Sequence, residues 1–252
     1  MATMRKPFQG VGNIIRFNWH FYLIAVVLIS LLFFLSNSYL IELKLITNIF
    51  LSLIFLNLAV SLLVSWYIYD RSDWYELNFL NELKNPQKIL NINAGFDETS
   101  VIIQSKFPDS ELVVFDFYDE NKHTENSIKR ARKAYPAYPG TVQIETEKMP
   151  ENDAEFDLIL NILSAHEIRN EKERIHFFRE QKRVLRENGK IIVTEHLRDL
   201  PNFLAYTIGF FHFHSKKIWL KTFEESGLGI EQEIKITPFI STFILKKNGI
   251  SS

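Results

Sequence analysis

Two long apolar stretches near the N-terminus place the strongest limit on what this chain can fold into. Residues 45–69 carry no charged side chain, and residues 19–35 are apolar apart from one histidine and one serine, with residues 39–41 prolonging them. A helix rises about 1.5 Å per residue, so either stretch can cross most or all of a hydrocarbon layer of about 30 Å. We therefore expect two transmembrane helices, at about residues 19–41 and 45–69, that form a hairpin.

Two other interpretations of these stretches stay open. A secretory signal peptide is disfavoured, because no small-residue cleavage pattern follows Leu35 and a second apolar stretch comes at once. The second alternative is that the stretches are buried core helices, which a series of polar residues at near-helical spacing favours. The same residues could instead line the contact between two membrane helices. That series consists of Asn48, Ser52, Asn57, Ser61 and Ser65.

The flanking charges predict the orientation of the hairpin. Arg5, Lys6 and Arg16 precede the first stretch with no acid among them, whereas the link between the stretches holds one acid and one lysine. Excess Lys and Arg remain on the cytoplasmic side of a membrane. We therefore expect a membrane anchor in residues 1–75, a multi-pass membrane location, and a cytoplasmic domain in residues 76–252.

Composition excludes several classes of function. The chain has no cysteine, which excludes disulfides, thiolate metal sites and cysteine nucleophiles. Its net charge of −1 disfavours nucleic acid as a partner. His212 and His214 flank Phe213 like a metal-binding pair, but no third ligand is evident nearby, so no metal is expected.

After residue 85, short apolar runs alternate with helical patterns, which predicts a parallel sheet covered by helices on both faces. Strands are expected at residues 89–93, 112–117, 141–146, 156–163, 190–194, 230–236 and 239–245, and helices at residues 97–107, 125–134, 171–186 and 218–226. Asn188-Gly189 is expected to end the third of these helices. The last two strands are so close that they must form an antiparallel hairpin. The predicted fold is a Rossmann-like α/β sheet of seven strands, mostly parallel, preceded by the two membrane helices.

The first of these strands and the turn that follows it predict a nucleoside-binding site. Residues 88–95 form a strand that runs into Gly95, and Asp116 closes the next apolar run about 20 positions later. A glycine turn lets a cofactor approach the backbone, and a helix N-terminus favours negative charge. The carboxylate at the end of the second strand can accept both hydroxyls of a ribose.

Residues 83–247 resemble the class I S-adenosylmethionine-dependent methyltransferases, of the type 11 group. Residues 89–95 stand where that family has its glycine-rich loop, although this chain has a single glycine there and asparagines in place of an acid and a glycine. Residues 156–167 are similar to the family's fourth-strand motif. Residues 183–190, Arg-Val-Leu-Arg-Glu-Asn-Gly-Lys, closely follow the signature before strand five.

The resemblance implies S-adenosyl-L-methionine as the cofactor, together with a set of residues that bind it. Asp116 matches the acid that holds the ribose, and Glu145 takes the place of the acid near the adenine amino group. The expected cofactor-binding residues are Asn91, Asn93, Ala94, Gly95, Asp116, Phe117, Glu145, Thr146 and Asn161.

Polar residues at the carboxyl ends of the fourth and fifth strands are the candidate catalytic groups. His166 follows the fourth strand with Glu167 beside it, and Glu195 and His196 follow the fifth. Methyl transfer requires an aligned acceptor, and a base only if that acceptor loses a proton. Each group also has a structural interpretation: His166 as a helix cap or a satisfied histidine, and the other two as part of a solvated loop.

Residues 202–214 crowd apolar side chains into a segment too short to span a bilayer. This segment is either a buried helix or an apolar lid wetted by lipid, and the hairpin on the same chain favours the lid. We therefore expect a membrane-anchored methyltransferase that acts on a hydrophobic small molecule such as a quinone, polyene, aromatic or lipid precursor. The alternative is a non-catalytic, membrane-anchored domain that binds a ligand or a partner protein.

Overall fold

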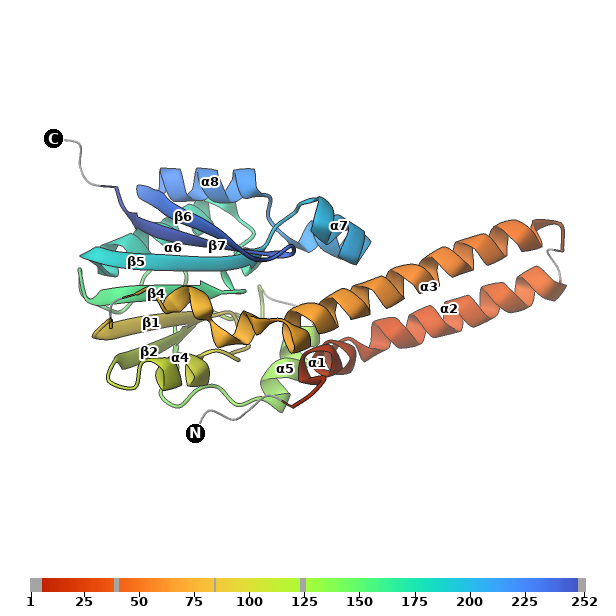
Figure 1. The fold of residues 1–252 in the computed structure, drawn as a ribbon, viewed down its shortest axis with the longest axis horizontal. Helices are drawn as coiled ribbons and strands as arrows, with labels where there is room; N and C mark the ends of the chain where they lie inside the picture. The colour runs from red at the N-terminus through yellow and green to blue at the C-terminus, as the bar shows by residue number, and fades with distance from the viewer. Residues whose placement is uncertain (1–5, 39–40, 84, 123–125, 249–252) are drawn as a thin grey trace.

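The computed structural model describes residues 6–38, 41–83, 85–122 and 126–248. The predictions made for Arg5 and for residues 39–40 lie outside these described residues. Within them, an α/β domain carries a long hairpin of two helices that projects from one side of the sheet, as Figure 1 shows.

The domain is built on one sheet of seven strands in the order β3-β2-β1-β4-β5-β7-β6. The first five strands along the chain pair in parallel, and β7 runs antiparallel to both β5 and β6. Their bounds are β1 Lys88–Asn93, β2 Glu111–Asp116, β3 Val142–Gln143, β4 Phe156–Ile162, β5 Leu185–His196, β6 Leu228–Thr237 and β7 Ile240–Lys247. The predicted fold class is confirmed.

Each face of the sheet has its own apolar core. Helices α6 (Glu171–Val184) and α8 (Lys216–Glu225) cover one face, where Phe177 and Trp219 are fully buried. Helix α4 (Ser100–Lys106) and a series of short helical turns in residues 67–80 cover the other face. Burying one large apolar side chain contributes about 1.5–3 kcal/mol to the stability of the fold. Both layers therefore stabilise the sheet.

The expected end of helix α6 at Asn188-Gly189 is wrong. The helix ends at Val184, and Leu185 already pairs with Phe156 as the first residue of β5. Arg186 binds both oxygens of Asp157 at 2.8 Å, which holds this segment against β4. The third strand is also shorter than expected, because the chain leaves the sheet's edge after Val142–Gln143.

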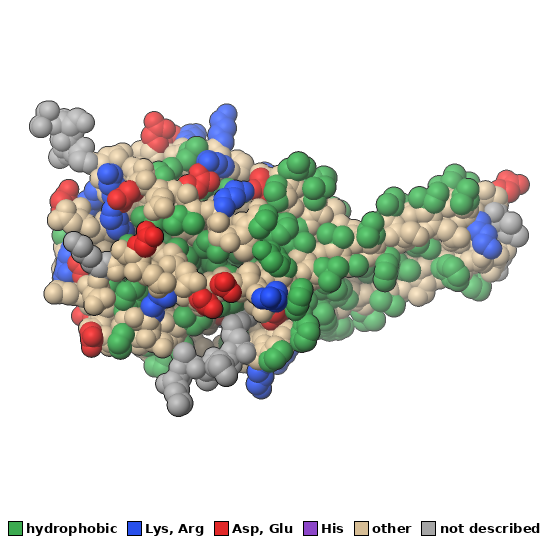
Figure 2. Space-filling view, in the orientation of Figure 1, with side chains coloured by type: hydrophobic (Ala, Val, Ile, Leu, Met, Phe, Trp, Pro, Cys, Tyr) green, Lys and Arg blue, Asp and Glu red, His purple; other side chains and the backbone are tan. Residues whose placement is uncertain are grey.

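The hairpin consists of α2 (Trp19–Ser38) and α3 (Lys44–Trp66), joined through the short turn Ile41–Leu43. Both helices are long and apolar enough to cross a membrane. Only 6% of the apolar stretch in α2 and 11% of that in α3 is buried inside the protein. Apolar side chains line the hairpin's surface in Figure 2. The two helices are therefore candidate membrane spans.

The described residues include an α-helix before the hairpin that the sequence patterns did not predict. Helix α1 (Gln9–Phe17) precedes the hairpin and packs against α5 (Asn126–Ala134) and the turn after α3. The Asp70 carboxylate accepts hydrogen bonds from the backbone N–H groups of Gly10 (2.7 Å) and Val11 (2.8 Å) and thereby caps α1. A Cβ on Gly10 would lie 2.4 Å from that of Tyr69, so glycine permits this close approach.

Candidate functional site

A cavity of about 220 Å³ lies at the carboxyl ends of β1 and β4. Neighbouring parallel strands whose connections lead to opposite sides of a sheet leave a crevice at this point, and ligands of open α/β folds bind there. The side chains that line it come from five parts of the chain, and include Asn13, Tyr69, Asn93, Ile128 and Leu163. The cavity therefore lies where the sheet's edge meets α1, α5 and the end of the hairpin.

A smaller cavity of about 80 Å³ adjoins the first, and both are lined by Asn93 and Phe96. It extends toward the end of β2, where Asp116 and Arg132 line it. The two cavities together extend along the carboxyl ends of β1, β2 and β4, where the predicted nucleoside site should lie. We call this stretch the nucleoside path.

Several buried polar atoms on these cavities lack a hydrogen-bond partner among the described residues. They are Asn13 Nδ2, Trp74 Nε1 and Asn93 Nδ2, which are donors, and Asp97 Oδ2, which is an acceptor. A buried polar group without a partner costs roughly 1–3 kcal/mol. The cavities therefore fit a ligand that offers acceptors to the donors and a donor to Asp97.

Asp116 lines the smaller cavity, but its oxygens are engaged by the protein. Oδ1 accepts from the backbone N–H groups of Gly95 (2.8 Å) and Tyr118 (2.9 Å), and Oδ2 pairs with Arg132 at 2.5 Å. Gly95 has a φ of 93°, in the left-handed region. A Cβ there would lie 2.8 Å from Tyr118 and 2.9 Å from Ile128, so these side chains cover the turn.

Of the nine expected cofactor-binding residues, Asn93, Gly95 and Asp116 line the cavities. Two others are buried and bound elsewhere. Asn91 donates to Ser100 Oγ at 2.8 Å and so holds the start of α4 to β1, while Asn161 and Gln181 exchange hydrogen bonds at 2.7 and 3.2 Å.

The remaining four expected residues also lie away from the cavities. Ala94 and Phe117 belong to the core that packs against α6. Thr146 is buried and donates to Glu173 Oε1, and Glu145 is exposed. The places of Glu145 and Thr146 follow from the early end of β3, since the chain after Gln143 turns toward α6, where Thr146 binds Glu173.

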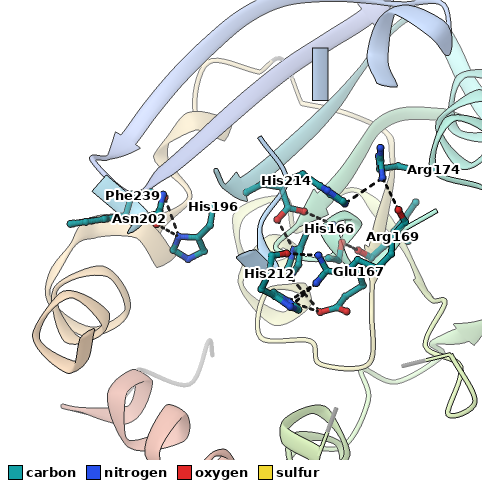
Figure 3. Close-up of polar contacts among 12 residues, drawn as sticks. His166, Glu167, Arg169, Arg174, His196, Asn202, His212, His214 and Phe239 are labelled. Atoms are coloured by element: carbon teal, nitrogen blue, oxygen red, sulfur yellow. Dashed lines mark hydrogen bonds and ion pairs between the residues drawn. The ribbon is translucent and has the colours of Figure 1, made fainter. Parts of the chain in front are cut away.

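The structure brings His166 and Glu195 together at the ends of β4 and β5. Nδ1 of His166 lies 2.7 Å from Glu195 Oε2. Its Nε2 lies 3.3 Å from Oε1 of Glu167, the residue next to it in Figure 3. Burial alone would lower the pKa of His166, but the charge of Glu195 and hydrogen bonds to both carboxylates outweigh it and raise the pKa to about 10. His166 is therefore an imidazolium at neutral pH in this arrangement.

His196 has a different environment, on the hairpin side of the same edge. Its Nδ1 faces two acceptors, Phe239 O (3.0 Å) and Asn202 Oδ1 (3.2 Å), so it carries the proton. Its Nε2 then accepts from the Tyr69 hydroxyl at 2.7 Å. Burial lowers the pKa of His196 to about 4. His196 is therefore neutral and orients Tyr69, which lines the larger cavity.

The segment predicted as a lid forms α7 (Leu200–Tyr206) and a 3₁₀ helix, Thr207–His212. It has a buried side with Asn202 and Ala205 and a strongly exposed apolar side, where Ile208 is 83% accessible. Thr207 Oγ1 donates to Asn57 Oδ1 of α3 at 3.2 Å, so the segment packs along the hairpin. The segment is therefore buried on one side only, and the lid interpretation stays a prediction.

Sequence reasoning missed the residues of α1 and the segment after α3 that line the larger cavity. Arg16 and its neighbours were treated only as a charged flank of the first span. The signal present was the amphipathic pattern of Gln9–Phe17, which places apolar and polar side chains on opposite sides of a helix.

The comparisons with known proteins agree with this geometry. A family model described as a methyltransferase domain matches residues 106–193. No curated protein sequence matches the chain. Among solved structures, the PH0226 protein from Pyrococcus horikoshii OT3 is similar with a TM-score of 0.53 and 17% identity, covering 73% of this chain and 95% of its own. PigF with SAH has a TM-score of 0.50 and 14% identity, covering 69% and 61%.

The match over residues 106–193 shows a methyltransferase-like domain, and the sheet order gives it the Rossmann-like fold of the similar solved structures. The predicted resemblance is confirmed, and S-adenosyl-L-methionine is the cofactor that this class uses. The unpartnered donors near β1 fit its carboxylate and hydroxyl oxygens, and Asp97 fits its ammonium group.

Proposed function

We propose that this protein is a membrane-anchored methyltransferase that transfers a methyl group from S-adenosyl-L-methionine to a hydrophobic small molecule. The anchor is residues 1–75 and the methyltransferase domain is residues 76–252, with α1 packed on the latter. The observation that carries the proposal is the place of the larger cavity, which is lined both by the cofactor edge of the sheet and by residues at the foot of the hairpin.

The position of α7 and the 3₁₀ helix supports delivery of the acceptor from a bilayer. Asn57, which binds this segment, lies roughly 14 Å from the end of α3 at about 1.5 Å per residue. If α3 spans a membrane up to Trp66, the segment reaches below the membrane surface. Its exposed apolar side, with Leu204, Ile208 and Phe211, would then contact lipid and not water.

The chain's own residues would align the acceptor with the cofactor and stabilise negative charge on the acceptor. The cofactor supplies an electrophilic methyl group, so the protein mainly has to orient the acceptor. A cationic His166, held by Glu195, would stabilise an acceptor oxygen that carries negative charge. His196 acts as a positioning residue through Tyr69. Asn93, Gly95 and Asp116 would hold the cofactor.

The test is methyl transfer by the full-length protein in lipid vesicles. We would supply S-adenosyl-L-methionine with a labelled methyl group and an apolar extract of membranes from the organism that encodes the chain. Label should pass into the organic phase, and Asp116→Ala should reduce that transfer, whereas Asp109→Ala, at an exposed position, should not. Label that stays in the aqueous phase would exclude a hydrophobic acceptor.

One observation favours the alternative of a non-catalytic binding domain. Arg132 occupies Asp116, and two side chains cover Gly95, so the nucleoside path must open before a cofactor enters. A protein that binds no S-adenosyl-L-methionine at millimolar concentration would support this alternative.

A further inference from the structure

Three potential metal ligands converge at the acceptor side of the sheet's edge, outside both cavities. His166 and Glu167 come from the 3₁₀ turn after β4, and His212 ends the 3₁₀ helix after α7 (Figure 3). Glu167 Oε1 lies 3.3 Å from His166 Nε2 and 3.3 Å from His212 Nε2. All three ligand atoms lie within 4.8 Å of one another.

These separations suit a small divalent cation. Zinc bonds of about 2.0–2.2 Å to histidine nitrogen and carboxylate oxygen, in a tetrahedron, place neighbouring ligand atoms about 3.3–3.4 Å apart. Both distances to Glu167 have that value. Two imidazoles and one carboxylate would leave at least one coordination position open, as in sites where a metal binds water or a substrate.

The surroundings of His166 prepare its Nε2 for a metal. Glu195, whose side chain is 1% exposed, binds the opposite ring nitrogen at 2.7 Å. A carboxylate in that place holds the Nδ1 proton, so a metal that displaces the Nε2 proton of the imidazolium to solvent finds the ring in the tautomer that binds it, as in many zinc-bound histidines. Glu167 and Glu195 also give the site two negative charges. The Glu167 and His212 side chains are 12% and 29% exposed, so an ion can reach them.

Arg169 is the one group that opposes a cation here among the described contacts of His212. Its guanidinium donates to the His212 carbonyl oxygen and lies 2.6 Å from Nδ1 and 3.1 Å from Nε2 of the ring. Arg169 is exposed, so it can turn toward solvent and leave Nε2 to an ion. His214, by contrast, is buried against Arg174 and takes no part.

We propose that His166, Glu167 and His212 bind one divalent cation, zinc foremost, with Glu195 as the group that orients His166. The sequence alone pointed away from a metal because His166 and Glu167 follow β4 whereas His212 follows β5 and α7, so no local pattern joins the three ligands. The cation would lie at the ends of β4 and β5 and, once bound, would replace the charge of the His166 imidazolium in stabilising an acceptor oxygen, a role that rests on the proposed function.

The experiment is a zinc titration of the full-length protein in detergent, purified without a histidine tag and stripped by a chelator. Calorimetry should give one Zn²⁺ per chain. His212→Ala and Glu167→Gln should each weaken binding by at least about tenfold, the loss expected from perturbing a metal's ligand shell. Co²⁺ in place of zinc should give a visible absorption band that both variants lose.

The matched control is His176→Ala, which removes an exposed histidine on α6. It should bind zinc as the parent does, and circular dichroism should confirm that all variants are folded. A parent that binds no zinc, or that binds it no more tightly than His212→Ala, would overturn the proposal. Titration of the same preparation with S-adenosyl-L-methionine separates a failure of the metal site from a failure of the proposed function.

Discussion

At the scale of single residues, the most consequential contact is the ion pair between Asp116 and Arg132. Asp116 occupies the position that a ribose-binding acid has in this fold, yet Arg132 NH1 lies 2.5 Å from its Oδ2. Arg132 also stacks on Tyr118, with its guanidinium carbon 4.6 Å from the ring centroid. A cofactor that binds Asp116 must therefore displace this arginine.

Replacing Arg132 by alanine should tighten the binding of S-adenosyl-L-methionine. The Arg132 side chain is 35% exposed, so solvent weakens the pair to about 0.5–1 kcal/mol, and the expected gain in affinity is roughly two- to fivefold. Calorimetric titration measures the gain. Lys133→Ala, an exposed neighbour on the same helix, is the control, and a weaker affinity in Arg132→Ala would mean that the arginine binds the cofactor itself.

The environment of His196 predicts a dependence of stability on pH. Its pKa is lowered to about 4 by burial, whereas an unfolded histidine has a pKa of about 6.5. The unfolded chain therefore takes up a proton first as the pH falls, and the neutral ring's contribution to the free energy of unfolding is lost between about pH 6.5 and 4.

His196→Gln should reduce that loss, because glutamine can donate to Phe239 O without titrating. Thermal unfolding midpoints of parent and variant, measured from pH 7 to pH 4, should converge as the pH falls. His176→Gln should follow the parent, since His176 is exposed. Parallel curves for parent and His196→Gln would show that the pKa of His196 in the native protein is not lowered from its value in the unfolded chain.

At the scale of elements, the sequence patterns predicted the sheet more completely than the site. Short apolar runs between the helical patterns identified every strand. A strand that is buried on both faces of the sheet has such a run, as residues Ile191 to Val193 show. Asn93, Gly95 and Asp116 line the cavities because the ends of β1 and β2 place them there. The interactions of Asn161 with Gln181, and of Asp116 with Arg132, depend on side chains far apart in the chain, and no local pattern reveals them.

Helix α1 was missed although its amphipathic pattern is present in the sequence, and its docking can be tested. Asp70 caps its first turn from the segment after α3, and loss of such a cap costs about 0.5–2 kcal/mol. Asp70→Ala should therefore speed hydrogen exchange in Gln9–Phe17 and weaken cofactor binding, because α1 lines the larger cavity. Asp73→Ala, an exposed acid three positions later, should leave both unchanged. Unaltered exchange in Asp70→Ala would exclude the cap.

At the scale of the whole molecule, the hairpin and the cofactor edge lie at the same end of the domain (Figure 1). This arrangement would place the larger cavity at the surface of a membrane that the hairpin spans. The basic residues before α2 then predict that both termini lie in the cytoplasm.

Reporter fusions after residue 252 test this topology. A green fluorescent protein fused there should fluoresce in cells, and alkaline phosphatase, which works outside the cytoplasm, should be inactive. The same phosphatase inserted between α2 and α3 should be active and serves as the control. An active phosphatase at the C-terminus would contradict a cytoplasmic domain.

The account's central claim is that the two cavities at the ends of β1, β2 and β4 bind S-adenosyl-L-methionine, and a calorimetric titration of the full-length protein in detergent tests it most directly. One cofactor should bind per chain. Asp116→Ala should weaken binding by about 1.5–3 kcal/mol, the usual contribution of hydrogen bonds to a charged group, while Asp109→Ala matches the parent. No binding by the folded parent, or equal binding by Asp116→Ala, would contradict the account.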